Sequence, residues 1–260
     1  MSERPVYVYG FVVPRLEDES VVFDTSDLRG LDHEPIELIE VGGVAAAVSA
    51  APVGRIRAQR RHLAAHQRVV AALAERTTTL PAAFGLISST NEVRDLLEHH
   101  GERVTAQAHR VHGCVEMTVK VRWADERGFE RLVELDPELR AMRDEMIAAG
   151  EGAPHELKVA IGRRVEHLLG SLRAEHGSAL ASATAEACRE LIEEDPGTEH
   201  ELARATYLVP RDGIEAFESA VESLANHLDD DFAIDITGPL APHHFVDVSI
   251  DAVQPSRAAA

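Results

Sequence analysis

The ten residues from Cys114 to Trp123 (CVEMTVKVRW) constrain the fold of this chain more than any other segment. From Val115 onward every second side chain is apolar, and the side chains between them are charged or polar. Such alternation is typical of a strand with one buried and one exposed face, as in an antiparallel sheet. We therefore expect a strand here, at the start of a sheet-containing domain.

The chain after this strand is predicted to be mostly helical. Residues 124–204 have helical periodicity, with breaks at Asp136-Pro137 and at residues 150–154. The apolar positions that follow fall on one side of a long helix or helix pair: Leu157, Ile161, Val165, Leu168, Leu172, Leu180, Ala187 and Leu191. A strand, an amphipathic helix and two extended pieces are expected next, at 205–210, 214–228, 232–237 and 244–250.

The chain before Cys114 alternates between strands and helices. Val6–Val13 (VYVYGFVV) is β-branched or aromatic apart from one Gly, which predicts a buried strand. Gly42-Gly43 favours a two-residue hairpin turn, and Pro81 favours the edge of a sheet. In chain order we expect two hairpin strands, a helix, an extended edge segment and a second helix, at 36–41, 44–49, 54–76, 80–87 and 91–111.

These elements predict an α+β chain of two two-layer domains. Each domain has a mostly antiparallel sheet with helices on one face, a modified ferredoxin-like arrangement, and the second carries a long helical insert. We expect an N-terminal domain at residues 1–112, a C-terminal domain at 113–255 and a frayed tail at 256–260. A length of 260 residues is sufficient for two such domains.

The charge of the chain restricts its partners. It has 45 acidic and 26 basic residues, a net charge of −19, and such a field repels nucleic-acid phosphates and anionic membranes. Aromatic residues make up only 4%, too few to favour a sheet that stacks bases. The start of the chain does not resemble a leader, no apolar run has membrane-spanning length, and two cysteines make no disulfide framework. We therefore expect a soluble cytoplasmic protein that binds neither nucleic acid nor membrane.

No spacing of reactive side chains predicts catalysis or a cofactor. His62 and His66 lie one helical turn apart, but Leu63 stands where a zinc hydrolase of this pattern needs a glutamate. The group HRVHGC at 109–114 lacks a second pair to complete a metal site. Nucleophile-elbow, P-loop and dinucleotide-binding motifs are absent. We expect no metal, no cofactor and no catalytic residue; a small-molecule enzyme or a nucleic-acid binder on a ferredoxin-like scaffold are the alternatives.

Several short motifs occur in a fixed order along nearly the whole chain. They are VYVYGF (6–11), HLAAH (62–66), LPAAFG (80–85), VEMTVKVRW (115–123), YLVP (207–210), ITGP (236–239) and Phe245-Val246. In this order and spacing they resemble the gas vesicle GvpL/GvpF family. Ala83 and His243 depart from the usual family pattern, which has Arg and Tyr at these places.

The resemblance implies a non-enzymatic accessory or minor structural protein of gas vesicles. It implies binding to the small hydrophobic shell protein (GvpA type) and to other gas vesicle proteins during assembly, in the cytoplasm and at the vesicle. A highly acidic chain suits this role, because it stays in solution while it covers an apolar partner. We expect an apolar edge or groove of the C-terminal domain to bind the shell subunit, with charged contacts to Arg of that subunit. The candidate partner-binding residues are Leu80, Phe84, Gly238, Pro239, Leu240 and Phe245.

Overall fold

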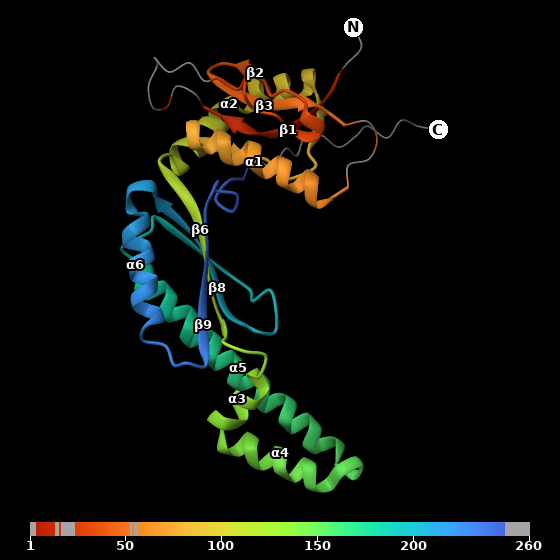
Figure 1. Ribbon diagram of the computed structural model, residues 1–260, viewed down its shortest axis with the longest axis vertical. Helices are drawn as coiled ribbons and strands as arrows, with labels where there is room; N and C mark the ends of the chain where they lie inside the picture. Colours follow the sequence, from red (N-terminus) through yellow and green to blue (C-terminus); the bar gives the residue numbers. More distant parts are fainter. Residues whose placement is uncertain (1–3, 14–15, 17–23, 53, 55–56, 248–260) are drawn as a thin grey trace. The chain divides into compact units, whose positions relative to one another are not determined.

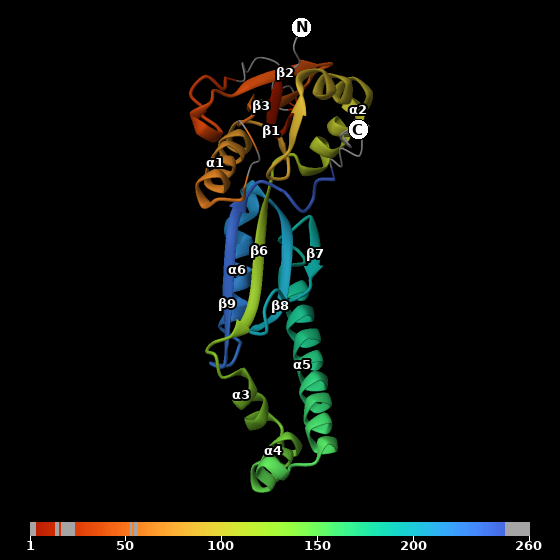
Figure 2. The ribbon, with the colours of Figure 1, turned by 90° about the vertical axis from the view of Figure 1, so that its right-hand side faces the viewer.

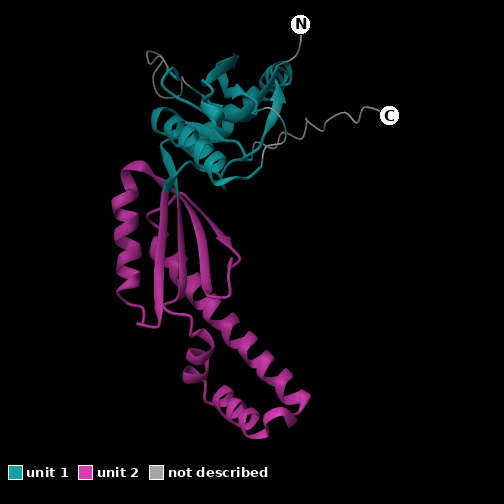
Figure 3. Cartoon of the chain, turned by 45° about the vertical axis from the view of Figure 1, so that its right-hand side comes forward, with its two compact units in different colours: residues 1–116, 239–260 teal, residues 117–238 magenta. Residues whose placement is uncertain are grey.

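The computed structural model describes residues 4–13, 16, 24–52, 54 and 57–247 (Figure 1). They form two compact units (Figure 3). The second unit is residues 117–238, and the first unit is the chain before it together with the chain from Pro239 onward. Each unit contains an antiparallel sheet and helices, which confirms the predicted α+β class.

The first unit is built on a sheet of five strands in the order β2-β3-β1-β4, with β5 also paired to β1. The strands are β1 (Pro5–Val12), β2 (Glu37–Val41), β3 (Val44–Ala50), β4 (Thr79–Pro81) and β5 (Ile87–Ser89). Gly42 and Gly43 join β2 to β3 with φ of 61° and 89°, the left-handed conformation that a two-residue turn requires. The predicted hairpin is confirmed. The predicted extended edge segment at 80–87 is confirmed only in part, because β4 lies at an edge of the sheet but ends at Pro81 and β5 begins at Ile87.

Two helices cover opposite faces of this sheet (Figure 2). Helix α1 (Arg60–Arg76) packs on the face that carries Tyr7, Tyr9 and Ala47, whereas α2 (Thr90–Val111) lies against the face that carries Val44. The sequence predicted helices on one face only. The difference follows from β1 and β3, whose residues are buried almost without interruption, because a strand that is apolar on both faces needs cover on both.

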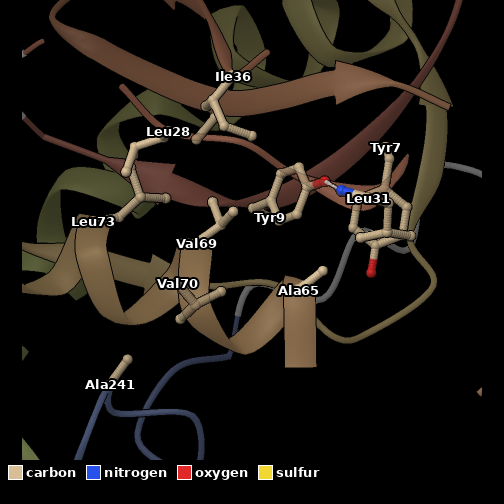
Figure 4. Packing of buried hydrophobic residues seen from close by; sticks show 11 residues of the cluster. Tyr7, Tyr9, Leu28, Leu31, Ile36, Ala65, Val69, Val70, Leu73 and Ala241 are labelled. Carbon is tan, nitrogen blue, oxygen red and sulfur yellow. Dashed lines mark hydrogen bonds between the residues drawn. The ribbon is translucent and has the colours of Figure 1, made fainter. Parts of the chain in front are cut away.

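The core between the sheet and α1 contains the two tyrosines of β1 (Figure 4). The hydroxyl of Tyr9 accepts a hydrogen bond of 2.8 Å from the backbone N–H of Leu31, in a 3-10 turn (η1, Leu31–His33). A β-carbon at Gly30 would lie 2.0 Å from that hydroxyl, so only glycine fits there. The Tyr9 ring thus fixes the position of η1 against the core.

The second unit has a four-stranded sheet in the order β7-β8-β6-β9. Its strands are β6 (Cys114–Trp123), β7 (Glu190–Glu194), β8 (Glu201–Pro210) and β9 (Phe232–Leu240). Its helices are α3 (Gly128–Leu135), α4 (Pro137–Ala149), α5 (His155–Thr184) and α6 (Ile214–Ala225), with short 3-10 turns at η2 (Gly150–Gly152) and η3 (Arg211–Gly213). Helices α5 and α6 contact each other and β8; in Figure 2, α6 lies behind the sheet and much of α5 extends below it.

The helical prediction for residues 124–204 is wrong in its last part. Helix α5 ends at Thr184, and β7 and the start of β8 follow within that range. Glu190 pairs with Leu208, and this ladder continues to Glu194, which lies opposite Arg204. Sheet pairing with β8 therefore overrides the helical preference of a glutamate-rich segment.

The chain after β9 belongs to the first unit. Ala241 enters the core against α1. The carboxylate of Glu116 accepts a hydrogen bond of 2.8 Å from the backbone N–H of His244, and its other oxygen lies 2.9 Å from His244 Nδ1. The predicted domain 113–255 therefore differs from the observed second unit, 117–238, mainly at its C-terminal end. Residues 244–247 form no strand, in contrast to the extended piece predicted at 244–250. Residues 248–255 and the predicted tail at 256–260 lie outside the described residues.

No helix in the described part of the chain is long and apolar enough to cross a bilayer.

Candidate partner-binding surface

The face of the second sheet that α5 and α6 do not cover is a ladder of paired polar groups. Lys120 Nζ lies 3.2 Å from Glu201 Oε1, and Arg122 Nε donates to Asp235 Oδ2 at 2.7 Å. The hydrogen bond and the charge of Asp235 raise the pKa of Arg122. Burial opposes ionisation of Glu201, but the N–H of Gly197 and the Lys120 ammonium outweigh it and lower the pKa of that carboxyl. These charges neutralise one another, so this face is neither a basic surface for an acidic partner nor an apolar surface for a hydrophobic one.

Strand β9 forms one edge of this sheet, with β6 as its neighbour. Its last six residues are exposed, including Ile236 at 40% and Leu240 at 42%. An unpaired edge of this kind is a template for a strand from another chain. Pro239 has no N–H to donate, so strand addition is confined to the part of β9 before Gly238.

The helical insert, which we define as α3 to α5, shares a small core with one end of the sheet, where Leu139 and Ile161 lie in the same cluster as Trp123 of β6 and Leu202 of β8. Asp136 connects α4 to α5. Its Oδ1 caps α4 by accepting a hydrogen bond of 2.6 Å from the N–H of Leu139. Both of its carboxylate oxygens also accept hydrogen bonds from the guanidinium of Arg164 in α5. The bonds from Arg164 lower the pKa of Asp136. The insert is therefore a braced helical element and not a loose extension.

Four large apolar side chains of the insert face solvent. Their exposed fractions are 43% for Phe129, 55% for Leu135, 67% for Ile147 and 36% for Val159. Several further apolar side chains of α4 and α5 are only partly buried against the insert core, namely Met142, Met146, Leu157, Val165, Leu168, Leu169 and Leu172. Apolar surface of this kind marks a place where another chain can bind.

The sequence did not single out these residues, although it predicted a long helical insert in the second domain. Val159 and Ile147 lie outside the regular apolar stripe of their helices, and this position is the feature of the sequence that could have identified them as exposed. Periodicity shows which side chains share a face, but it does not show whether another element covers that face.

The six residues predicted from the sequence fall into different environments. Leu80 in β4 and Phe245 are 0% and 1% exposed, inside the first unit. Phe84, in the loop between β4 and β5, is half-buried on the core at α1, with its ring centroid 6.2 Å from that of Tyr7. Gly238, Pro239 and Leu240 are exposed at the end of β9. Only these last three present side chains or backbone freely to a partner.

A buried cluster of rings in the first unit resembles a reactive site but has the properties of a core. His66 Nδ1 lies 2.9 Å from the hydroxyl of Tyr7, and the His66 ring stacks on Tyr9 with centroids 5.6 Å apart. Burial, with a smaller effect of His243, lowers the pKa of His66 to about 4, and burial raises the pKa of Tyr7 to about 12. Both groups are neutral near pH 7. Among the residues that the structure describes, no three His, Cys, Asp or Glu side chains are placed to hold a metal ion.

Comparison with protein families places this fold among gas vesicle proteins. Residues 5–247 match the family model described as "Gas vesicle synthesis protein GvpL/GvpF". The chain is 32% identical over 246 residues to gas vesicle protein F of Streptomyces sp. (strain CB03234), covering 93% of this chain and 99% of the relative. It is 26% identical over 244 residues to gas vesicle protein F of Microcystis aeruginosa (strain PCC 7806), covering 92% and 97%.

Solved structures show the same fold. The crystal structure of gas vesicle protein GvpF from Anabaena sp. PCC7120 superposes with a TM-score of 0.77 at 26% identity and covers 95% of this chain and 99% of that chain. GvpF from Microcystis aeruginosa gives a TM-score of 0.74 at 24% identity, covering 93% and 98%.

Proposed function

The chain belongs to the gas vesicle synthesis protein GvpL/GvpF family and is a gas vesicle-associated protein; from this premise we propose that it binds the hydrophobic shell protein (GvpA type) and other vesicle proteins during assembly. The proposed role is binding and not catalysis, and it is exercised in the cytoplasm and at the growing vesicle.

One observation carries this proposal: exposed apolar side chains are concentrated on the second unit. Among the described residues, five of the eight large apolar side chains that are exposed lie within residues 117–238, and four of these five belong to the insert. Helices α3 and α4 are not needed to cover the sheet, because α6 and α5 already contact it. The exposed apolar side chains of the insert suit a partner that is itself apolar, because contact removes both surfaces from water.

The charge of the second unit supports the same role. Residues 117–238 contain 27 acidic and 13 basic residues, so they carry −14 of the net charge of −19. Carboxylates around an apolar contact provide ion pairs to Arg of a shell subunit and keep the complex from aggregating. Gly238, Pro239 and Leu240 extend the proposed contact along β9, whereas Leu80 and Phe245 are buried in the first unit and are not part of it.

The test is capture of purified shell protein by the full chain and by two matched variants. The insert variant replaces Leu135, Ile147 and Val159 with Ser; the control variant replaces Leu63 and Ile87 of the first unit, both 38% exposed, with Ser. We expect the insert variant to lose at least about tenfold in affinity, since each exposed apolar contact contributes on the order of 1 kcal/mol. Equal retention of shell protein by both variants, or none by the unaltered chain, would contradict the proposal.

A further inference from the structure

Helix α1 of the first unit has a basic outer face in a strongly acidic protein. Between residues 41 and 74 the sequence has no Asp or Glu. Arg60, Arg61 and Arg68 lie on the exposed side of α1, opposite the side that enters the core. Among the described residues, the ion pairs of this helix are those of His62 with Asp32 and Arg76 with Asp27, so these three guanidinium groups have no carboxylate partner there.

Helix α6 of the second unit has the opposite character. From Asp212 to Asp235 there are eight acidic residues and no Lys or Arg. Glu215, Glu218 and Glu222 lie on the exposed side of α6, while Phe217 and Val221 face the core. Within the described part of the chain these three glutamates form no ion pair, so their charges are available to a partner.

The two faces match in spacing as well as in sign. Arg61 and Arg68 are seven residues apart, as are Glu215 and Glu222, and seven residues span about 10.5 Å along a helix. Two helices laid side by side can therefore form both Arg–Glu pairs at once. Small side chains run beside the glutamates on α6 (Ala216, Ser219, Ala220 and Ser223), which allows the long arginine stems to lie close to the helix.

We propose that the basic face of α1 docks on the acidic face of α6 in a second copy of this chain. Each molecule carries one face of each sign, so a molecule can contact a second copy through α1 and a third copy through α6, and the contact can then repeat into a row. The net negative charge does not prevent it, because at physiological ionic strength charges interact over only about 8 Å and the local pairs dominate. Exposed ion pairs are individually weak, so the rows form at high local concentration and dissolve as salt is added.

The experiment is sedimentation of the full chain over a wide concentration range, with two charge-reversal variants. Arg61→Glu with Arg68→Glu makes both faces acidic, and Glu215→Arg with Glu222→Arg makes both faces basic. We expect the unaltered chain to associate reversibly, and each variant alone to associate at least about tenfold more weakly. An equimolar mixture of the two variants restores association, because each acidic face then meets a basic one.

A control variant, Arg163→Glu with Arg173→Glu, changes the net charge as much as the first variant but alters exposed positions on α5. It should associate as the unaltered chain does. All substitutions are at exposed positions, and circular dichroism checks that each variant is folded. A chain that stays monomeric at every concentration, or a mixture that associates no better than its components, overturns the proposal. If the unaltered chain binds an added acidic protein through α1 but does not bind a second copy of itself, the proposal is also overturned. None of these outcomes bears on capture of the shell protein by the insert.

Discussion

The two units each contain an antiparallel sheet, but they differ in how helices cover it. The sheet of the first unit is covered on both faces, by α1 and α2, and its strands β1 and β3 are almost entirely buried. The sheet of the second unit is covered on one face, and most of its helical mass lies in an insert with exposed apolar side chains. The second unit also carries most of the net charge. The difference is that the first unit buries both faces of its sheet, whereas the second leaves apolar side chains exposed, which is the surface that we propose for partners.

Replacing a buried residue of the first unit should have the largest effect. Leu80→Ala removes a fully buried side chain and should lower the free energy of unfolding by about 2–5 kcal/mol. Leu240→Ala, at the exposed end of β9, should change it by less than about 0.5 kcal/mol. Denaturant unfolding of both variants measures this contrast. Equal effects would show that β9 is as tightly packed as the first unit.

Acid should weaken the first unit through His66. Its pKa is about 4 in the folded chain and about 6.5 unfolded. Above pH 6.5 the ring is neutral in both states; as the pH falls toward 4 the unfolded state takes up a proton that the folded state does not, so stability falls in that window. The loss is on the order of 1–2 kcal/mol after allowance for partial solvent screening.

The matched variant for this prediction is His66→Gln, which does not titrate between pH 4 and 6.5. Unfolding curves at both ends of that range should show a smaller loss of stability for the variant than for the unaltered chain. Identical losses would show that His66 is not responsible for the acid sensitivity.

The polar face of the second sheet should contribute less. Thr206 is fully buried; its hydroxyl lies 2.9 Å from that of Thr118 and also donates to Glu194. Thr206→Val should cost about 1–2 kcal/mol, because it leaves Thr118 and Glu194 with one hydrogen bond fewer. Thermal melting of this variant beside Thr237→Val, at an exposed position of β9, measures the difference. No loss would show that the uncovered face relies on solvent and not on this ladder.

The smallest effect on stability is expected in the insert. Ile147→Ser should change the free energy of unfolding by less than about 0.5 kcal/mol, because two thirds of the side chain is already exposed. A clear decrease in melting temperature would indicate that the side chain supports the insert and is not free for a partner.

Several features of the fold followed from the sequence because their signals are local. The alternation at 114–123 predicted β6, and Gly42-Gly43 predicted the β2–β3 turn. Strand β7 was missed because three of its five residues are glutamate, and only its pairing with β8 makes it a strand. The second helix layer of the first unit was missed although β1 lacks a polar face, which was the signal for cover on both sides.

The candidate surface was less predictable. Leu80 and Phe245 were predicted to bind a partner, yet both are core residues. The exposed apolar side chains of the insert share their residue types with core positions. Whether such a side chain is covered depends on packing between distant segments, which a single sequence does not reveal.

The central claim, that partners bind the second unit, is tested most directly by hydrogen exchange of the full chain with and without purified shell protein. We predict that bound shell protein slows exchange in the insert (α3 to α5) and along β9, and leaves β1, β3 and α1 unchanged. Slower exchange confined to the first unit, with the insert unaffected, would contradict the account.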